Sequence, residues 1–291
     1  MLLRSAPVAR IIGLLSLILA LGGCSAVKLG YNNLPELAYW WIDGYVDLED
    51  AQALRVRQEL ARIHTWHRLE ELPRILPLLG QLERMAGGEL SPAQACALEP
   101  AIRERIDALR AQLEPAVAGL APTLTAAQLR HLERKYAQNN REFERRWVRA
   151  EPAELLERRA KLFAERAETV YGHLEERQHA VLRQELQASG YRPHVVLAER
   201  RRRQQETLQV LRTLADSQAS PEQALVAVRG LMERFFASPD PAYRAHAQAQ
   251  REEVCRVAAA VHNSTTPAQR DHAARRFRAW QRDLAELSQQ R

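Results

Sequence analysis

Glycine and cysteine are both scarce in this chain, with 12 glycines and 3 cysteines among 291 residues. The sequence contains no Gly-rich phosphate loop, no Gly-x-Ser-x-Gly turn and no Cys-x-x-Cys pair. Those spacings are typical of nucleotide-binding, hydrolytic and redox sites. Alternating apolar and polar residues bounded by Asn-Gly or Asp-Gly turns are also absent, so no β-sheet is expected. These absences predict a protein that is not an enzyme and that needs no cofactor.

The one extended apolar stretch, residues 11–21, is shorter than the roughly 20 residues that span a membrane. Two arginines precede it, and two glycines and Cys24 follow it, which is the layout of a secretory signal. The order Leu-Gly-Gly-Cys resembles the lipobox of bacterial lipoproteins. The resemblance implies that residues 1–23 are a lipoprotein signal peptide, that Cys24 carries the acyl chains, and that residues 24–33 form the lipid anchor and a short tether. An ordinary secreted protein cut nearby is the alternative.

Ser25 follows the cysteine at the position where inner-membrane lipoproteins carry Asp as a retention mark. We therefore expect the protein to be anchored in the outer membrane and to face the periplasm. Nucleic acid is not an expected partner in that compartment, and a net charge of +6 is too small to argue for one. The expected partners are the membrane, through the acyl chains, and envelope or unfolded proteins.

Alanine, leucine, glutamate, arginine and lysine make up more than half of the chain, which is typical of long helices. Apolar residues recur at steps of three and four, as in the series Leu98, Ile102, Ile106, Leu109, Leu113 and Val117. We expect an all-α fold, a multi-helix bundle of about ten helices. The break "SGYRP" at 189–193 indicates two packed helical sub-domains, residues 34–190 and residues 191–291.

Five segments share the pattern of a capped helix start: "LEDAQ" (48–52), "LSPAQ" (90–94), "LTAAQ" (124–128), "ASPEQ" (219–223) and "TTPAQ" (265–269). In such a capping box the Ser or Thr side chain accepts from the amide of the glutamine, whose side chain reaches back to the cap. In the first copy Glu49 is a poor cap, and we expect Asp47 to serve instead. "LTAAQ" also resembles the Leu-Thr-x-x-Gln signature of periplasmic chaperones of the Spy and CpxP type. Both interpretations stay open.

The segments "LGYNNLPELAYWWIDGYVDLEDAQ" (29–52) and "WHRLEELP" (66–73) resemble an uncharacterised family of proteobacterial helical lipoproteins. The resemblance extends over most of the chain after the signal peptide, and that family is catalogued as a domain of unknown function. It implies an all-helical outer-membrane lipoprotein. It assigns no activity and no catalytic residue.

Two histidines and a glutamate form the most enzyme-like group in the sequence. His64, His67 and either Glu70 or Glu71 follow at helical steps, so they could present two imidazoles and a carboxylate to a divalent metal ion. The alternative is an ordinary pair of His67 and Glu71 on a helix surface. The metal site would belong to a metal-binding protein or a metal-dependent enzyme.

Cys96 and Cys255 are the cysteines that remain once Cys24 is acylated. The periplasm is oxidising, so a disulfide bond between them is one expectation. The alternative is two separate buried thiols that pack as small apolar side chains.

Two further groups are candidate partner-binding residues. Arg200, Arg201, Arg202 and Arg203 are consecutive, so at most two of them can face one partner from a helix. Trp40 and Trp41 follow closely after the anchor, where aromatic residues could lie at the level of lipid headgroups. A solvated arginine face and an aromatic cap on the helical core are the alternatives.

The sequence thus favours a lipid-anchored, non-catalytic protein that binds other proteins, either as a scaffold or as a chaperone-like holdase. A holdase is expected to have a cupped, weakly apolar and partly basic surface, whereas a scaffold needs one patch for one partner.

Overall fold

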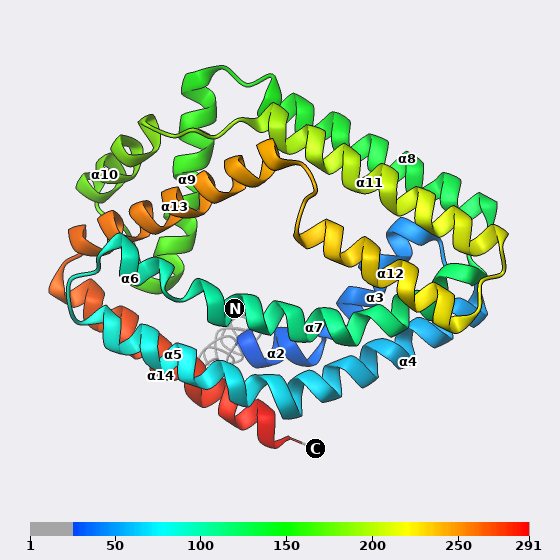
Figure 1. Ribbon diagram of the computed structural model, residues 1–291. Coiled ribbons are helices and arrows are strands. Elements are labelled where there is room, and N and C mark those ends of the chain that lie inside the picture. Colours follow the sequence, from blue (N-terminus) through cyan, green and yellow to red (C-terminus); the bar gives the residue numbers. More distant parts are fainter. Residues whose placement is uncertain (1–25, 291) are drawn as a thin grey trace, which may run out of the picture.

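The computed structural model describes residues 26–290 (Figure 1), of which 86% are helical, with no strand among them. The prediction of an all-α multi-helix bundle is confirmed. The proposed signal peptide, residues 1–23, and the proposed lipidation site, Cys24, lie outside the described residues. None of the described helices is long and apolar enough to cross a membrane.

The helices follow one another with short connections. They are α2 (Ala26–Asn32), α3 (Leu34–Val46), α4 (Asp50–Trp66), α5 (Leu72–Ala86), α6 (Pro92–Cys96), α7 (Glu99–Leu120), α8 (Ala126–Phe143), α9 (Pro152–Tyr171), α10 (Glu176–Gln187), α11 (Pro193–Asp216), α12 (Pro221–Phe236), α13 (Pro241–Ser264) and α14 (Pro267–Gln289). Two π-helical turns, η1 (His67–Glu71) and η3 (Glu144–Val148), and a 3-10 turn, η2 (Ala121–Thr123), continue the helices before them.

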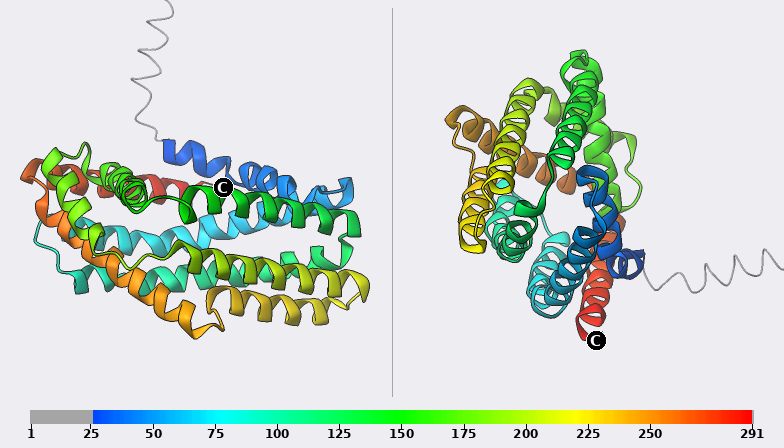
Figure 2. Two further views of the ribbon diagram at one scale, coloured as in Figure 1. Left: turned by 90° about the horizontal axis from the view of Figure 1, so that it is seen from above. Right: turned by 90° about the vertical axis from the view of Figure 1, so that its right-hand side faces the viewer.

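The helices are arranged around an elongated, flattened ring (Figures 1 and 2). Segments far apart in the sequence pack side by side: α5 against α14, α6 against α13, α7 against α12 and α8 against α11. The expected boundary coincides with the break between α10 and α11. However, every one of these four pairs joins a helix from residues 34–190 to one from residues 191–291, so the two ranges interleave.

Three groups of buried apolar side chains form the core. The first joins α7, α8, α11 and α12 and includes Val228, which is 0% exposed. The second joins α9, α10 and α13 around Leu182, and the third joins α5 and α14 around Phe277. Each fully buried side chain of this size contributes about 1.5–3 kcal/mol relative to an exposed one. All three groups lie within residues 26–290, so this part of the chain carries its own core.

Capping boxes begin all five of the helices for which the sequence predicts them. Ser91, Thr125, Ser220 and Thr266 each accept a hydrogen bond from the amide of the glutamine three residues later, as predicted. The prediction for the first copy is wrong, because Glu49 and not Asp47 is the N-cap of α4. Gln52 Oε1 accepts from the Glu49 amide at 3.0 Å and completes that box. A sixth box, at Glu175, was not predicted.

Four of these glutamines form two hydrogen-bonded pairs, and all of them except the half-buried Gln269 are buried. Gln128 donates to Gln52 at 2.6 Å and also to the Asp47 carbonyl at 2.7 Å, which joins the starts of α4 and α8. Gln178, which is 0% exposed, donates to Gln269 at 2.6 Å and joins the starts of α10 and α14. Each glutamine therefore completes the capping box of its own helix and also bonds to a second helix start.

A disulfide bond joins Cys96 at the end of α6 to Cys255 in α13, with 2.02 Å between the sulfur atoms and 5.5 Å between the Cα atoms. It links residues 159 positions apart. Helices α6 and α13 are thus tied covalently as well as by packing.

Replacing a paired glutamine should cost more stability than replacing an unpaired one. Gln178→Ala removes hydrogen bonds to the Glu175 amide, the Ser264 carbonyl and Gln269 and leaves buried groups unsatisfied, so we expect a loss of about 3 kcal/mol. The matched control is Gln223→Ala, an exposed capping glutamine that bonds only within its own box, with an expected loss of about 1 kcal/mol. Urea unfolding measures both, and equal losses would contradict the role of the pair.

Removing the disulfide bond should lower stability without changing the helical content. For Cys96→Ala combined with Cys255→Ala we expect the free energy of unfolding to fall by about 2–5 kcal/mol, because the cross-link restricts a long loop in the unfolded chain. Unfolding followed by circular dichroism, with and without reductant, measures the effect. If the wild-type midpoint does not respond to reductant, the two cysteines are not paired in solution.

Candidate binding cavity

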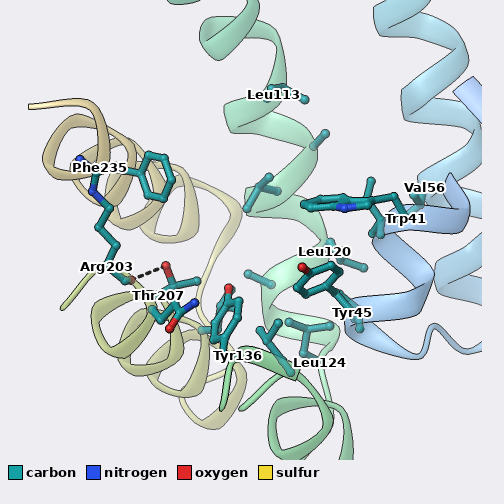
Figure 3. Close-up of a pocket in the computed structure, with 18 of the residues that line it drawn as sticks. Trp41, Tyr45, Val56, Leu113, Leu120, Leu124, Tyr136, Arg203, Thr207 and Phe235 are labelled. Carbon is teal, nitrogen blue, oxygen red and sulfur yellow. Dashed lines mark hydrogen bonds between the residues drawn. The ribbon is translucent and has the colours of Figure 1, made fainter. Parts of the chain in front are cut away.

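A partly open cavity of about 630 Å³ lies between α3, α4, α7, α8 and α11, and Phe235 of α12 and Tyr243 of α13 complete its wall. Figure 3 shows Trp41 and Val56 on one side of it and Arg203 and Phe235 on the other. Its volume is in the range of ligand-binding pockets, roughly 300–1,000 Å³. This is the candidate functional site.

The wall of the cavity is mostly apolar because α7 and α4 turn apolar side chains toward it. On α7 the stripe consists of Leu113, Val117 and Leu120, at the spacing of one helix face. Val56 and Ile63 on α4 line the opposite side and are themselves buried. The cavity therefore offers apolar contact over most of its surface.

Aromatic side chains enclose the end of the cavity near α3 and α8. The rings of Trp41 and Tyr45 lie 4.8 Å apart, and those of Tyr45 and Tyr136 lie 6.3 Å apart. Asn139 donates to the Tyr45 hydroxyl at 2.6 Å. Burial raises the pKa of Tyr136 to about 12, so its phenol stays neutral at physiological pH. This end of the cavity is uncharged but keeps a few hydrogen-bonding groups.

The arginine run divides between the cavity and the rest of the surface. Arg200 and Arg203 line the cavity. Arg203 donates to Glu199 at 2.7 Å and lies 4.7 Å from the centre of the Phe235 ring. Arg201 pairs with Glu144, and Arg202 pairs with Glu199 and Glu206. Only part of the run is therefore available to a ligand.

Glu199 organises the charged side of the cavity. It is 4% exposed and accepts from both Arg202 and Arg203. Burial alone would raise the pKa of Glu199, but hydrogen bonds from the two guanidiniums outweigh that effect and lower it. The carboxylate therefore stays ionised and fixes Arg203 against the wall.

The chemical groups in the cavity are suited to binding. Among the lining residues the one aliphatic hydroxyl, on Thr207, donates to the Arg203 carbonyl at 2.8 Å (Figure 3). No histidine, cysteine or aspartate is among the residues that line it. Its charged groups are guanidiniums and two glutamates, Glu59 and Glu199, and both glutamates accept from arginines.

The three candidate metal ligands lie on one helical segment, but each has another partner. His64 Nε2 is 3.0 Å from the Tyr31 carbonyl, and His67 Nδ1 is 3.0 Å from the Tyr31 hydroxyl. Glu71 is 1% exposed and pairs with Arg105 and Arg74 at 3.2 and 3.0 Å. Within residues 26–290 no group of three His, Cys, Asp or Glu side chains is placed to hold a metal ion.

The neighbouring carboxylate, Glu70, is 3.8 Å from Arg74 and is exposed. The two tryptophans after the proposed anchor are also exposed, Trp40 by 60% and Trp41 by 66%. Trp41 lines the mouth of the cavity, whereas Trp40 does not.

The cavity itself was not predicted from the sequence. The apolar stripe on α7 was visible as a periodic series, but its partners come from α3, α4, α8 and α11, which only the tertiary fold brings together. Of the predicted partner-binding residues, the fold brings Trp41, Arg200 and Arg203 to this one site.

Comparison with known families gives a match. The model of DUF6279, described as a family of unknown function, matches residues 44–233, which is more than half of the chain and includes most of the cavity wall. No curated protein and no solved structure matches.

The histidines that bond to Tyr31 should make stability depend on pH. Burial lowers the pKa of both His64 and His67 below the usual 6.5, so the unfolded chain binds protons at these sites before the folded chain does. The free energy of unfolding should therefore fall as the pH decreases through about 6.5 toward the folded pKa values. Urea unfolding at about pH 7.5 and about pH 5.5 measures the loss. His67→Gln should reduce it, and an unchanged pH dependence in that variant would count against His67.

Proposed function

We propose that this chain, which belongs to the DUF6279 family of unknown function, is a lipid-anchored envelope protein that holds apolar segments of unfolded proteins in the cavity. The cavity is the observation that carries the proposal. It is cupped, mostly apolar and bordered by arginines, which are the properties expected of a holdase surface.

The size and openness of the cavity suit a few side chains of an extended client. Each leucine-sized side chain that leaves water contributes about 1.5–3 kcal/mol, so two or three of them give useful but reversible affinity. The aromatic end formed by Trp41, Tyr45 and Tyr136 can accept an aromatic client residue with ring contacts. Such contacts do not depend on one client sequence, which suits a holdase.

Two guanidiniums at the cavity can attract acidic residues that flank an apolar client segment. Neither Arg55 nor Arg200 forms an ion pair with another residue of 26–290, and both line the cavity. Arg55 is exposed, so its attraction for a client should weaken in salt.

The cellular place of the protein rests on residues outside the described part of the chain. The signal layout of residues 1–23 and the resemblance of Leu-Gly-Gly-Cys to a lipobox support acylation of Cys24. Ser25 supports the outer membrane, on its periplasmic side. The resemblances to proteobacterial helical lipoproteins and, more weakly, to the Spy and CpxP type of chaperone agree with an envelope holdase.

A scaffold with one envelope partner remains the related alternative, and the cavity would then be its patch. The metal-dependent alternative at His64, His67 and Glu71 has less support, because those side chains already bond to Tyr31 and to two arginines.

The test is protection of an aggregating client. Residues 25–291, which contain the three core groups described above, should suppress aggregation of citrate synthase diluted from guanidinium chloride, at near-stoichiometric ratio and less well in high salt. Leu113→Asn and Ala116→Phe, which make the cavity polar or fill it, should each reduce protection several-fold, by roughly the loss of one buried apolar contact. Light scattering measures the aggregation.

Ile102→Asn is the matched control, because Ile102 is on the same helix as Leu113, is 50% exposed and lies outside the cavity. It should protect as well as the wild type. Wild-type protein that folds but gives no protection would refute the holdase, and cross-linking in cells would then be used to find a single partner. Equal effects of Leu113→Asn and Ile102→Asn would refute the cavity as the binding site.

A further inference from the structure

We infer that one outer face of the protein lies directly against a phospholipid bilayer. This face, called the α2–α3 face, consists of the exposed apolar side chains Leu29, Leu34, Leu37, Trp40 and Trp41. The inference rests on the lipid anchor of the proposed function and adds a membrane-binding surface of the folded chain to it.

These five side chains form the densest group of exposed large apolar residues in the described part of the chain. Their exposed fractions run from 48% for Leu34 to 69% for Leu29. Leu34, Leu37 and Trp41 follow at steps of three and four on α3, and so share one side of the helix. Tyr39 points the other way and is buried, with the Arg57 guanidinium 3.5 Å from the centre of its ring.

The position of this face relative to the proposed anchor indicates that a bilayer covers it. Cys24 is two residues before Ala26, the first residue of α2, and two residues span at most about 7 Å. Acyl chains on Cys24 would therefore enter the bilayer beside α2. Figure 2 shows α2 and α3 along one outer face of the molecule, with α12 at the opposite face.

The residue types also fit a bilayer surface. Tryptophan is enriched where hydrocarbon meets headgroups, and both Trp40 and Trp41 are more than half exposed. Leucine side chains reach the acyl region. One short acyl chain gives only reversible binding, and a second apolar contact strengthens the attachment.

A row of basic side chains borders the apolar residues on the neighbouring helix. Helix α8 packs against α3, and His131 Nε2 lies 3.4 Å from the Gly44 carbonyl at the end of α3. Arg134, Lys135 and Arg141 line the same shallow hollow as His131 and form no ion pair with any residue of 26–290. Anionic headgroups would neutralise these charges.

Trp41 belongs both to this face and to the wall of the cavity. Binding of the face to a membrane therefore places the cavity mouth next to the lipid surface. The face gives the protein one orientation, which a flexible lipid anchor alone would not impose.

The test uses residues 25–291 without acyl chains, so that binding does not depend on Cys24. We expect this form to sediment with vesicles of phosphatidylethanolamine and phosphatidylglycerol and to show blue-shifted tryptophan emission. Leu37→Gln combined with Trp40→Gln should lower the partition coefficient by about ten-fold or more, because two exposed apolar side chains are removed. Arg134→Gln with Lys135→Gln should weaken binding to these vesicles but not to phosphatidylcholine.

Val226→Gln is the matched control, since Val226 is 69% exposed on α12 at the opposite face, and its partition should equal that of the wild type. Circular dichroism checks that each variant is folded. The inference is overturned if the wild type does not bind vesicles, or if Leu37→Gln with Trp40→Gln binds as well as the control. It is also overturned if the face proves to join two copies of the chain, seen as a dimer that the double variant dissociates.

The test of membrane binding can fail or succeed independently of the test of client protection. Leu37→Gln with Trp40→Gln leaves both cavity and arginines intact and should keep client protection, whereas Leu113→Asn should keep vesicle binding. Loss of vesicle binding with protection intact would place the membrane contact on this face. If Leu37→Gln with Trp40→Gln loses both vesicle binding and client protection, the two surfaces are not distinct, and the assignment is overturned.

Discussion

The fold depends on two hydrogen-bonded pairs of glutamines, three of them buried, that hold four helix starts together. Each glutamine satisfies the free amide at the start of its own helix and also bonds across to another helix start. A buried amide side chain without partners is costly, so these positions specify both the start and the neighbour of each helix. The pair of Gln52 and Gln128 joins the start of α4 to the start of α8, and both helices line the cavity.

The helices around the cavity are fixed at several points. Gln52 and Gln128 fix one end of α4 and α8, and the core group around Val228 fixes α7 and α11. The charged wall is fixed separately by Glu199 and its two arginines. Leu124, Leu132 and Leu211 belong both to that core group and to the wall of the cavity, so the core and the cavity lining share side chains.

The sequence predicted local features well and long-range ones poorly. Capping boxes at Ser91, Thr125, Ser220 and Thr266 follow from four-residue patterns, so they could be predicted, and so could the all-α fold. The pairing of the capping glutamines could not, because it joins residues 76 and 91 positions apart. The prediction that Asp47 caps α4 was wrong because the side chain of Glu49 is longer than that of a usual cap, yet Glu49 serves as the cap. Gln52 completes its capping box. The cavity needs five helices in place and has no local signal.

The first and last described helices are neighbours, since α2 packs on α14 and Lys28 pairs with Glu286. Helix α14 also packs along α5 and ends at Gln289. A chain that is made from its first residue onward cannot form these contacts until α14 has been made. Contacts of such long sequence separation also form slowly. Helices α2 and α5 therefore gain their partner only after the other described helices have been made.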